Sequence, residues 1–224
     1  MPDSRCLVLF TKPAIAGRVK TRLIGELTAE QAAELHGAFL GDLLERVEAG
    51  DFALRIAWAL DPGEPLPEGP LPAFRQQGAD LGERLFHGLA AAADEHDFVA
   101  AIGSDHPELP LSHIHSGFDK LAAGAEVVLG PATDGGYYLV GTTRQTLSRE
   151  IFAGIDWSTE RVLTSTRDRC RDLGLSCELL PTGADVDTPD DLNRLASRLA
   201  KGGCDCPRTI QLLRAWRRIS PQTV

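Results

Sequence analysis

The apolar positions of this chain follow two periods, one typical of strands and one typical of helices. A short apolar run opens the chain, and apolar residues alternate from Leu54 to Leu60, which predicts two strands. With the later apolar runs, strands are predicted at 7–10, 54–60, 98–102, 126–129, 137–141 and 176–180. Apolar residues three or four positions apart predict helices at 29–48, 81–94, 112–123, 159–173, 189–201 and 207–218. Because the two kinds of element alternate, the sequence predicts an α/β fold with a layered sheet.

Local signals mark two of the helix starts. The stretch from Thr28 to Gln31 fits a capping box ahead of the first helix. Thr188 is a good N-cap, because Pro189 would take the first helical position and Asp191 lies three residues after the cap. These signals place the helix starts more firmly than the apolar pattern alone.

Composition and charge narrow the class of protein. No linker divides the 224 residues, so we expect a single domain over 1–224, with a proline-rich exposed loop at 61–73. The net charge of −9 argues against binding to nucleic acid or to an anionic membrane. No apolar stretch approaches the ~20 residues needed to cross a bilayer, and residues 1–10 lack the features of a signal peptide. We therefore expect a soluble, cytoplasmic protein, and the sequence gives no indication of its oligomeric state.

The five cysteines stand at irregular spacing. An odd number without a regular pattern argues against a disulfide framework. Cys204 and Cys206 could join Cys170 and Cys177 in a zinc site, but the spacing matches no familiar zinc pattern. Reduced thiols are the favoured interpretation, with the Cys204–Cys206 pair near a surface turn.

A basic loop follows the first predicted strand. One glycine and four cations lie within it: Lys12, Gly17, Arg18, Lys20 and Arg22. Arginine forks onto phosphate oxygens and lysine acts as a point charge, so the loop is suited to a polyphosphate. It is not a Walker A motif, because Val19 stands where a glycine must precede the lysine. A solvated basic loop without a ligand is the alternative interpretation.

A second candidate phosphate-binding stretch spans residues 76–84 and joins a loop to a predicted helix. Arg84 would lie near the first turn, where its charge opposes the helix dipole. This conflict favours an anionic partner for Arg84, with Gln77 from the preceding loop beside it. An ordinary surface arginine paired with a carboxylate is the alternative.

Acidic residues lie at the ends of apolar runs far apart in the chain. The stretch 103–107 reads Gly-Ser-Asp-His-Pro, so Ser104 and Asp105 emerge directly from a buried strand. Asp185 and Asp187 alternate just before a helix and share one side of an extended segment. Ligands of open α/β sheets bind at the carboxyl ends of strands, and aspartate oxygens suit Mg²⁺ or Mn²⁺ shared with substrate phosphates. The sequence therefore predicts a divalent metal beside a diphosphate.

The stretch 130–139 reads Gly-Pro-Ala-Thr-Asp-Gly-Gly-Tyr-Tyr-Leu. The two glycines after Asp134 allow the backbone to approach a ligand closely. The same Asp-Gly pair is also a strong signal for a tight hairpin. Both interpretations stay open, and they are compatible.

Together these stretches resemble a known family. The order of the basic loop, 103–107, 130–139 and 185–192, which reads Asp-Val-Asp-Thr-Pro-Asp-Asp-Leu, resembles the DUF2064 group of glycosyltransferase-like proteins, within the nucleotide-diphospho-sugar transferase superfamily. The same layout is more distantly similar to phospholactate guanylyltransferase and to molybdenum-cofactor guanylyltransferase. The resemblance covers about residues 5–200 and implies a single-domain GT-A fold, with a mainly parallel sheet between helices.

The resemblance also implies roles for individual residues. Asp105 would take the place of the metal-binding carboxylate, and Asp187 would be the second acidic group at the Mg²⁺ or Mn²⁺. Arg18 and Lys20 would face the phosphates, with Arg22 beside them. This sequence departs from the wider superfamily in having one glycine before the arginine of the loop.

Three functions are consistent with these residues. The first is a glycosyltransferase that uses a nucleotide-diphosphate sugar and a small-molecule acceptor; an inverting reaction needs a base, for which Asp134 and His106 are candidates. The second is a nucleotidyltransferase, in which a phosphorylated small molecule attacks a nucleoside triphosphate and releases pyrophosphate, with Lys20 offsetting charge on the α-phosphate. The third is a nucleotide-binding protein without catalysis, which should bind nucleotide equally well without its metal carboxylates.

Overall fold

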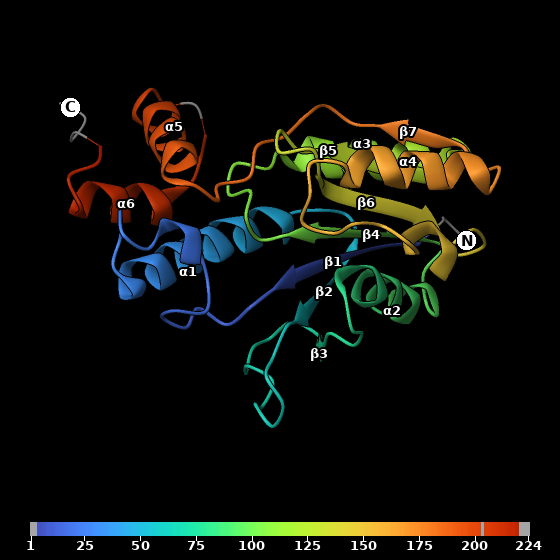
Figure 1. Ribbon diagram of the computed structural model, residues 1–224, viewed down its shortest axis with the longest axis horizontal. Coiled ribbons are helices and arrows are strands. Elements are labelled where there is room, and N and C mark those ends of the chain that lie inside the picture. Colours follow the sequence, from blue (N-terminus) through green and yellow to red (C-terminus); the bar gives the residue numbers. More distant parts are fainter. Residues whose placement is uncertain (1–3, 203, 220–224) are drawn as a thin grey trace.

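The computed structural model describes residues 4–202 and 204–219, and these form one seven-stranded sheet flanked by helices (Figure 1). The strand order is β3-β2-β1-β4-β6-β5-β7. The strands are β1 (Arg5–Thr11), β2 (Ala53–Trp58), β3 (Ala73–Arg75), β4 (Phe98–Gly103), β5 (Val127–Pro131), β6 (Tyr137–Thr143) and β7 (Cys177–Leu179). Strand β6 runs antiparallel to both neighbours, and the other pairs are parallel. The prediction of a mainly parallel α/β sheet is thus confirmed.

Six α-helices and two short 3₁₀ helices belong to the described residues. The α-helices are α1 (Ala29–Val47), α2 (Leu81–Ala93), α3 (Leu111–Ala122), α4 (Val162–Asp172), α5 (Pro189–Ala200) and α6 (Pro207–Ala215). The 3₁₀ helices are η1 (Thr21–Leu23) and η2 (Arg149–Phe152). None of the helices in 4–202 and 204–219 has the length and apolarity needed to span a membrane. The predicted domain of 1–224 also includes positions 1–3, 203 and 220–224, which lie outside the described residues.

Strand β1 shows how the sheet is covered on both faces. Its side chains alternate, so that Val8 and Phe10 pack with residues of α2, η2 and α4, whereas Leu7 and Leu9 pack with residues of α1 and α3. Because both faces are buried, β1 reads in the sequence as a continuous apolar run rather than an alternating one.

A third apolar cluster lies beyond the carboxyl end of β1. Leu35 and Phe39 of α1 pack there against Leu192 and Leu195 of α5 and Leu213 of α6. Figure 1 shows α5 and α6 together at this end of the molecule, beside the loop that leaves β1. The C-terminal helices therefore form a wall next to the edge where ligands of α/β sheets bind.

Both predicted helix caps are present. The Thr28 side chain accepts a hydrogen bond from the Gln31 backbone N–H, and the Gln31 side chain returns one to Thr28. Thr188 and Asp191 form the same reciprocal pair at the start of α5, with Pro189 in the first turn. The second cap fixes the point at which the chain turns from the 185–187 segment into α5.

Two of the differences between the structure and the predicted elements have a clear physical reason. Strand β3 lies at the end of the proline-rich loop and pairs with β2 over only three residues, too few to show a period in the sequence. Helix α4 begins at Val162 rather than Thr159, because the Thr159 hydroxyl donates to Asp156 O and closes a turn there. Asp134 and the two glycines after it form the predicted hairpin between β5 and β6.

Candidate active site

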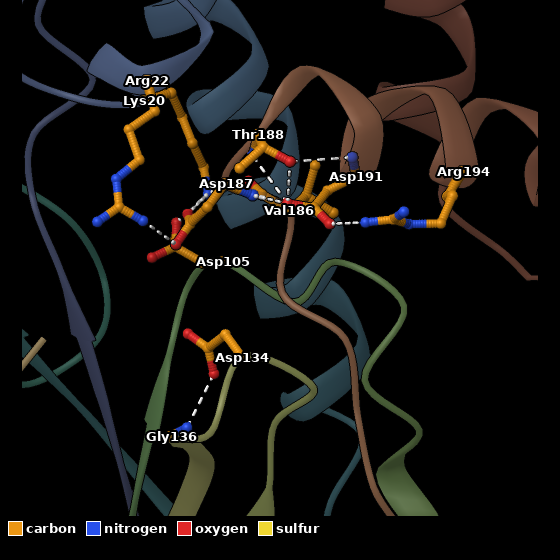
Figure 2. A network of polar contacts seen from close by, with 10 residues as sticks. All are labelled: Lys20, Arg22, Asp105, Asp134, Gly136, Val186, Asp187, Thr188, Asp191 and Arg194. Atoms are coloured by element: carbon orange, nitrogen blue, oxygen red, sulfur yellow. Dashed lines mark hydrogen bonds and ion pairs between the residues drawn. The ribbon is translucent and has the colours of Figure 1, made fainter. Parts of the chain in front are cut away.

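The acidic stretches and the basic loop meet at the carboxyl end of the sheet. Asp105 follows β4, and Asp187 closes the segment ahead of α5. The two carboxylates share one cation, since Lys20 Nζ lies 2.5 Å from Asp105 Oδ1 and 3.1 Å from Asp187 Oδ1 (Figure 2). Residues more than eighty positions apart thus converge, as the sequence predicted.

Lys20 is an internal part of this site and not a surface cation. Its side chain is only 2% exposed, and Nζ also donates to Val186 O at 2.7 Å and lies over the Phe39 ring. Although burial works against the charge, Asp105 and Asp187 outweigh it and raise the pKa of Lys20. In this structure the ammonium thus serves as the counter-ion of the carboxylates.

The backbone of Lys20 explains how it reaches the carboxylates. Its φ of 47° is left-handed, which is uncommon for a residue with a side chain. Buried side chains hold the chain on both sides, Val19 before it and Leu23 in η1 after it. Such local strain persists only where surrounding structure imposes it, and it is concentrated at functional sites.

A third carboxylate, Asp185, stands beside the pair. Burial first, and then the charges of Asp105 and Asp187, raise the pKa of Asp185 to about 7. Burial also opposes the charge of Asp105, but Lys20 outweighs it and lowers the pKa of Asp105. The site therefore holds more negative charge than the single ammonium of Lys20 neutralises.

One cavity of about 460 Å³ contains these groups. Its size lies within the usual range for small-molecule sites. The cations on its wall are Lys12, Arg18, Lys20, Arg22 and Arg84, and the carboxylates are Asp105, Asp185 and Asp187. Apolar side chains, among them Phe10, Leu85 and Tyr137, complete the lining. A second recess of about 810 Å³ shares several of the cations and extends toward the 59–63 loop.

Arg18 is held by the proline-rich loop. Its guanidinium forms a two-pronged ion pair with Glu64, and Nη2 lies 3.0 Å from Asp61 Oδ2. Arg75 fixes the same loop by donating to Leu60 O and Asp61 O at 3.0 Å. The loop predicted at 61–73 is thus attached to the phosphate-binding candidate Arg18, so a ligand must compete with Glu64 for it.

Ser104 and His36 are buried residues that line the cavity. Ser104 is 3% exposed, and its hydroxyl accepts from Thr11 Oγ1 at 2.9 Å. The buried His36 places Nε2 3.0 Å from Lys12 O and 3.3 Å from Thr11 Oγ1. Burial, the main influence, lowers the pKa of His36. A neutral ring thus fixes the start of the basic loop, a role that the position of His36 within α1 did not signal.

Four predicted site residues are not among those lining the cavity: Gly17, Gln77, His106 and Asp134. His106 is buried and packs edge-on against the Tyr138 ring. Gln77 and Gly17 are exposed, and Gly17 adopts a φ of 78° that glycine permits. Asp134 is also exposed, and its Oδ1 accepts from the Gly136 N–H at 2.9 Å within the hairpin turn (Figure 2). Gln76 lines the cavity instead of Gln77, because β3 pairs with β2 and directs Nε2 of Gln76 to Ala57 O at 2.8 Å.

The donor set fits a metal bound jointly with phosphate. Within 4–202 and 204–219, no group of three or more His, Cys, Asp or Glu side chains is arranged to hold a metal ion. Mg²⁺, however, commonly takes one or two protein carboxylates and completes its shell with water and substrate phosphates. Asp105 and Asp187 already converge on one cation, and they could offer their oxygens to a metal in this way.

Comparison with known proteins gives both a family match and structural matches. Residues 43–159 match the family described as "Uncharacterized protein conserved in bacteria (DUF2064)". A crystal structure from Desulfovibrio desulfuricans G20, provisionally assigned as a nucleotide-diphospho-sugar transferase, is 32% identical, covers 96% of both chains and has a TM-score of 0.87. No curated protein matches the chain.

Two further structures share the fold at much lower identity. A cytidylyltransferase from Leptospira borgpetersenii is 14% identical, with 99% of each chain covered and a TM-score of 0.59. A CMP:2-keto-3-deoxy-manno-octonic acid synthetase complexed with CTP is 13% identical, covering 89% of this chain and 99% of its own, with a TM-score of 0.57. At this identity the likeness shows the fold alone, which is the GT-A type of sheet predicted from the sequence.

Proposed function

Since the chain belongs to the DUF2064 family, we propose that it is a transferase that moves a sugar from a nucleotide-diphosphate sugar to a small-molecule acceptor. The observation that carries this proposal is the cavity of about 460 Å³, in which five cations face three carboxylates at the carboxyl ends of β1 and β4. Such a cavity is suited to a diphosphate leaving group together with a divalent ion. The provisional assignment of the Desulfovibrio relative agrees with it.

Each charged group has a place in this proposal. Lys12, Arg22 and Arg84 bind the diphosphate oxygens, and Arg18 joins them when it is released from Glu64. Asp105 and Asp187 hold Mg²⁺ or Mn²⁺, which when bound compensates the charge that develops on the departing diphosphate. Lys20 holds the two carboxylates together until its ammonium is displaced by the metal ion, and the ammonium then lies close enough to share in that compensation.

Asp185 is the better candidate for the base that deprotonates the acceptor hydroxyl. It lines the cavity, whereas Asp134 is exposed and occupied by the Gly136 N–H. A base must lie within hydrogen-bond reach of the proton that it removes. We therefore propose Asp185 in the role for which the sequence offered Asp134 and His106, neither of which lines the cavity. The exchange Asp134→Asn provides a matched control for Asp185→Asn.

Nucleotidyl transfer is the second candidate, and the density of cations favours it. Lys12, Arg18 and Lys20 lie on one loop and would suit the three phosphates of a nucleoside triphosphate. A phosphorylated acceptor is already ionised, so this reaction needs no base. The cytidylyltransferases that share the fold carry out chemistry of this kind.

One assay separates the two reactions. The protein is incubated with Mn²⁺ and either nucleotide-diphosphate sugars plus alcohols or nucleoside triphosphates plus sugar phosphates. Release of nucleoside diphosphate supports sugar transfer, and release of pyrophosphate supports nucleotidyl transfer. Loss of activity in Asp185→Asn with activity kept in Asp134→Asn supports the base assignment, and the reverse pattern overturns it. If Asp105→Ala binds nucleotide as tightly as the wild type and neither product forms, the chain is a binding protein without catalysis.

A further inference from the structure

Two thiols lie side by side in the segment between α5 and α6, away from the carboxylates of the cavity. Cys204 Sγ and Cys206 Sγ are 3.6 Å apart. Cys206 is buried at the N-cap of α6, whereas Cys204 is partly exposed. The pair is therefore close enough to be bonded after a small movement, with one sulfur open to solvent and the other protected.

Arg46 of α1 lies against both sulfurs. Its Nη2 is 3.6 Å from Cys204 Sγ and 3.4 Å from Cys206 Sγ, and it also donates to Asp205 O at 2.5 Å. Its Nη1 donates to Pro107 O at 2.5 Å. These four contacts fix the guanidinium, so its charge stays beside the thiols. A cation beside a thiol favours the thiolate, which is the reactive form of cysteine.

We propose that Cys204 and Cys206 form a redox-active dithiol that a small-molecule disulfide oxidises reversibly to an intramolecular disulfide. The family match spans residues 43–159 and includes neither cysteine. The proposal does not depend on the transferase function, because neither sulfur lines the cavity of about 460 Å³.

The reaction proceeds by two thiol–disulfide exchanges. The Cys204 thiolate attacks one sulfur of the small disulfide, forms a mixed disulfide and releases one thiolate. The Cys206 thiolate then attacks the Cys204 sulfur, closes the protein disulfide and releases the second thiolate. The protein dithiol loses two protons and two electrons, and the small disulfide gains them as two thiols. The order of attack follows from exposure, since only Cys204 is open to the reagent.

The electrostatic setting agrees with this division of roles. The hydrogen bond with Cys206, and after it the charge of Arg46, lower the pKa of Cys204. The single S–H of Cys206 can turn either to Cys204 or to Pro107 O, from which Cys206 Sγ lies 3.3 Å. Cys206 therefore stabilises the Cys204 thiolate first and resolves the mixed disulfide afterwards.

A metal site is a poorer explanation of the same two thiols. The guanidinium of Arg46 occupies the space beside both sulfurs, where a soft metal cation would meet its repulsion. The zinc site considered from the sequence also fails, because Cys170 and Cys177 pack in the cluster of α2 and α4, whereas Cys204 and Cys206 pack in that of α5 and α6. The four thiols therefore lie in two separate clusters, and no zinc cluster forms among the described residues.

The test uses the full chain in buffers of defined reduced and oxidised glutathione. After acid quenching and alkylation, peptide mass mapping should find one disulfide joining Cys204 to Cys206, which dithiothreitol removes. The pair Cys170 and Cys177 serves as the internal control within the same sample. A Cys204–Cys206 peptide that stays unmodified at every glutathione ratio while the chain remains folded would overturn the proposal, as would a crosslink found only at Cys170 and Cys177.

Two single variants test the roles of the sulfurs. Cys206→Ser should accumulate glutathione on Cys204, because the resolving thiol is gone. Cys204→Ser should react much more slowly at the buried Cys206, by about tenfold or more if accessibility and thiolate fraction both decide the rate. Equal rates of modification in the two variants would contradict the assignment of Cys204 as the attacking thiol.

Discussion

Replacement of Lys20 by methionine tests the arrangement of charge in the site most sharply. Methionine keeps much of the buried length of the side chain but removes the ammonium that lies between Asp105 and Asp187. Removal of one partner from a buried ion pair costs about 3–5 kcal/mol, whereas an exposed pair contributes about 0–1 kcal/mol. Lys20 is 2% exposed, but its partners are 45% and 38% exposed, so an intermediate cost of about 2 kcal/mol is expected.

That loss has a defined thermal signature. For a chain of this length, about 1 kcal/mol corresponds to roughly 2–4 °C in Tm, so Lys20→Met should melt about 4–8 °C below the wild type at pH 8. The loss should shrink toward pH 5. Without the ammonium, the pKa values of the clustered carboxylates rise above their unfolded values. A carboxyl group with a raised pKa stabilises the folded state more at low pH than at high pH.

Addition of Mn²⁺ should then distinguish the variant from the wild type. In the wild type a metal ion must displace the ammonium, whereas in Lys20→Met the carboxylates are free to bind it. A metal ion at a hundred times its Kd stabilises the fold by about 2.7 kcal/mol, so the variant should gain more in Tm from Mn²⁺ than the wild type does. Differential scanning fluorimetry without nucleotide measures this difference.

Arg22→Met is the matched control for Lys20→Met. Arg22 lies 4.0 Å from Asp187 Oδ2 but is 68% exposed, so its removal should change neither Tm nor the Mn²⁺ response appreciably. Equal melting temperatures and equal Mn²⁺ shifts in wild type and Lys20→Met would refute the reasoning.

Three further predictions concern the surroundings of the site. The pKa of Asp185 is raised to about 7 in the fold. Ionisation of Asp185 therefore destabilises the folded state as the pH rises above the pKa of about 4 that the group has in the unfolded chain. Asp185→Asn should melt above the wild type at pH 8 and should approach it below pH 4. Glu64→Gln should bind pyrophosphate more tightly than the wild type in isothermal titration, because it removes the two-pronged partner of Arg18 and leaves Asp61 beside the guanidinium, whereas Glu68→Gln on the same loop should match the wild type. Thr188→Ala removes the cap of α5 and should lower Tm by roughly 2–4 °C in a thermal melt, which corresponds to about 1 kcal/mol.

Much of the fold could be predicted because its local signals agree with its packing. Strand β1, buried on both faces, gives a continuous apolar run, and the capping residues Thr28 and Thr188 mark helix starts independently of the apolar pattern. Strand β3 could not be predicted, because its three residues are ordered by pairing with β2 and not by a period of their own. Helix α4 begins later than predicted, because the hydrogen bond from the Thr159 side chain to Asp156 O forms a turn ahead of the helix.

The sequence could predict most of the charged residues that line the cavity, but not the contacts that they make with one another. Asp105 follows the end of β4, where ligands of α/β sheets bind, and the segment ahead of α5 brings Asp187 to the same edge. The contact of Lys20 with carboxylates could not be predicted, because it depends on a left-handed backbone that the residue type disfavours. Gln76 rather than the predicted Gln77 lines the cavity, because the pairing of β3 with β2 decides which of the two faces it, and the sequence did not reveal that pairing.

The thiol pair is connected to the site through the backbone of Pro107. Arg46 and Cys206 both bond Pro107 O, two residues beyond Asp105. A disulfide removes the S–H donor of Cys206, and a hydrogen bond of this kind contributes about 0.5–1.5 kcal/mol. A comparison of nucleotide affinity between the oxidised and the reduced wild type would reveal whether this change reaches the carboxylates.

The most direct test of the central claim is anomalous diffraction from crystals grown with Mn²⁺ and a nucleoside diphosphate. The account predicts a manganese peak in contact with the carboxylates of Asp105 and Asp187 and with the phosphates of the nucleotide. A nucleotide bound in the cavity with manganese located elsewhere, or with neither carboxylate in contact with it, would contradict the account.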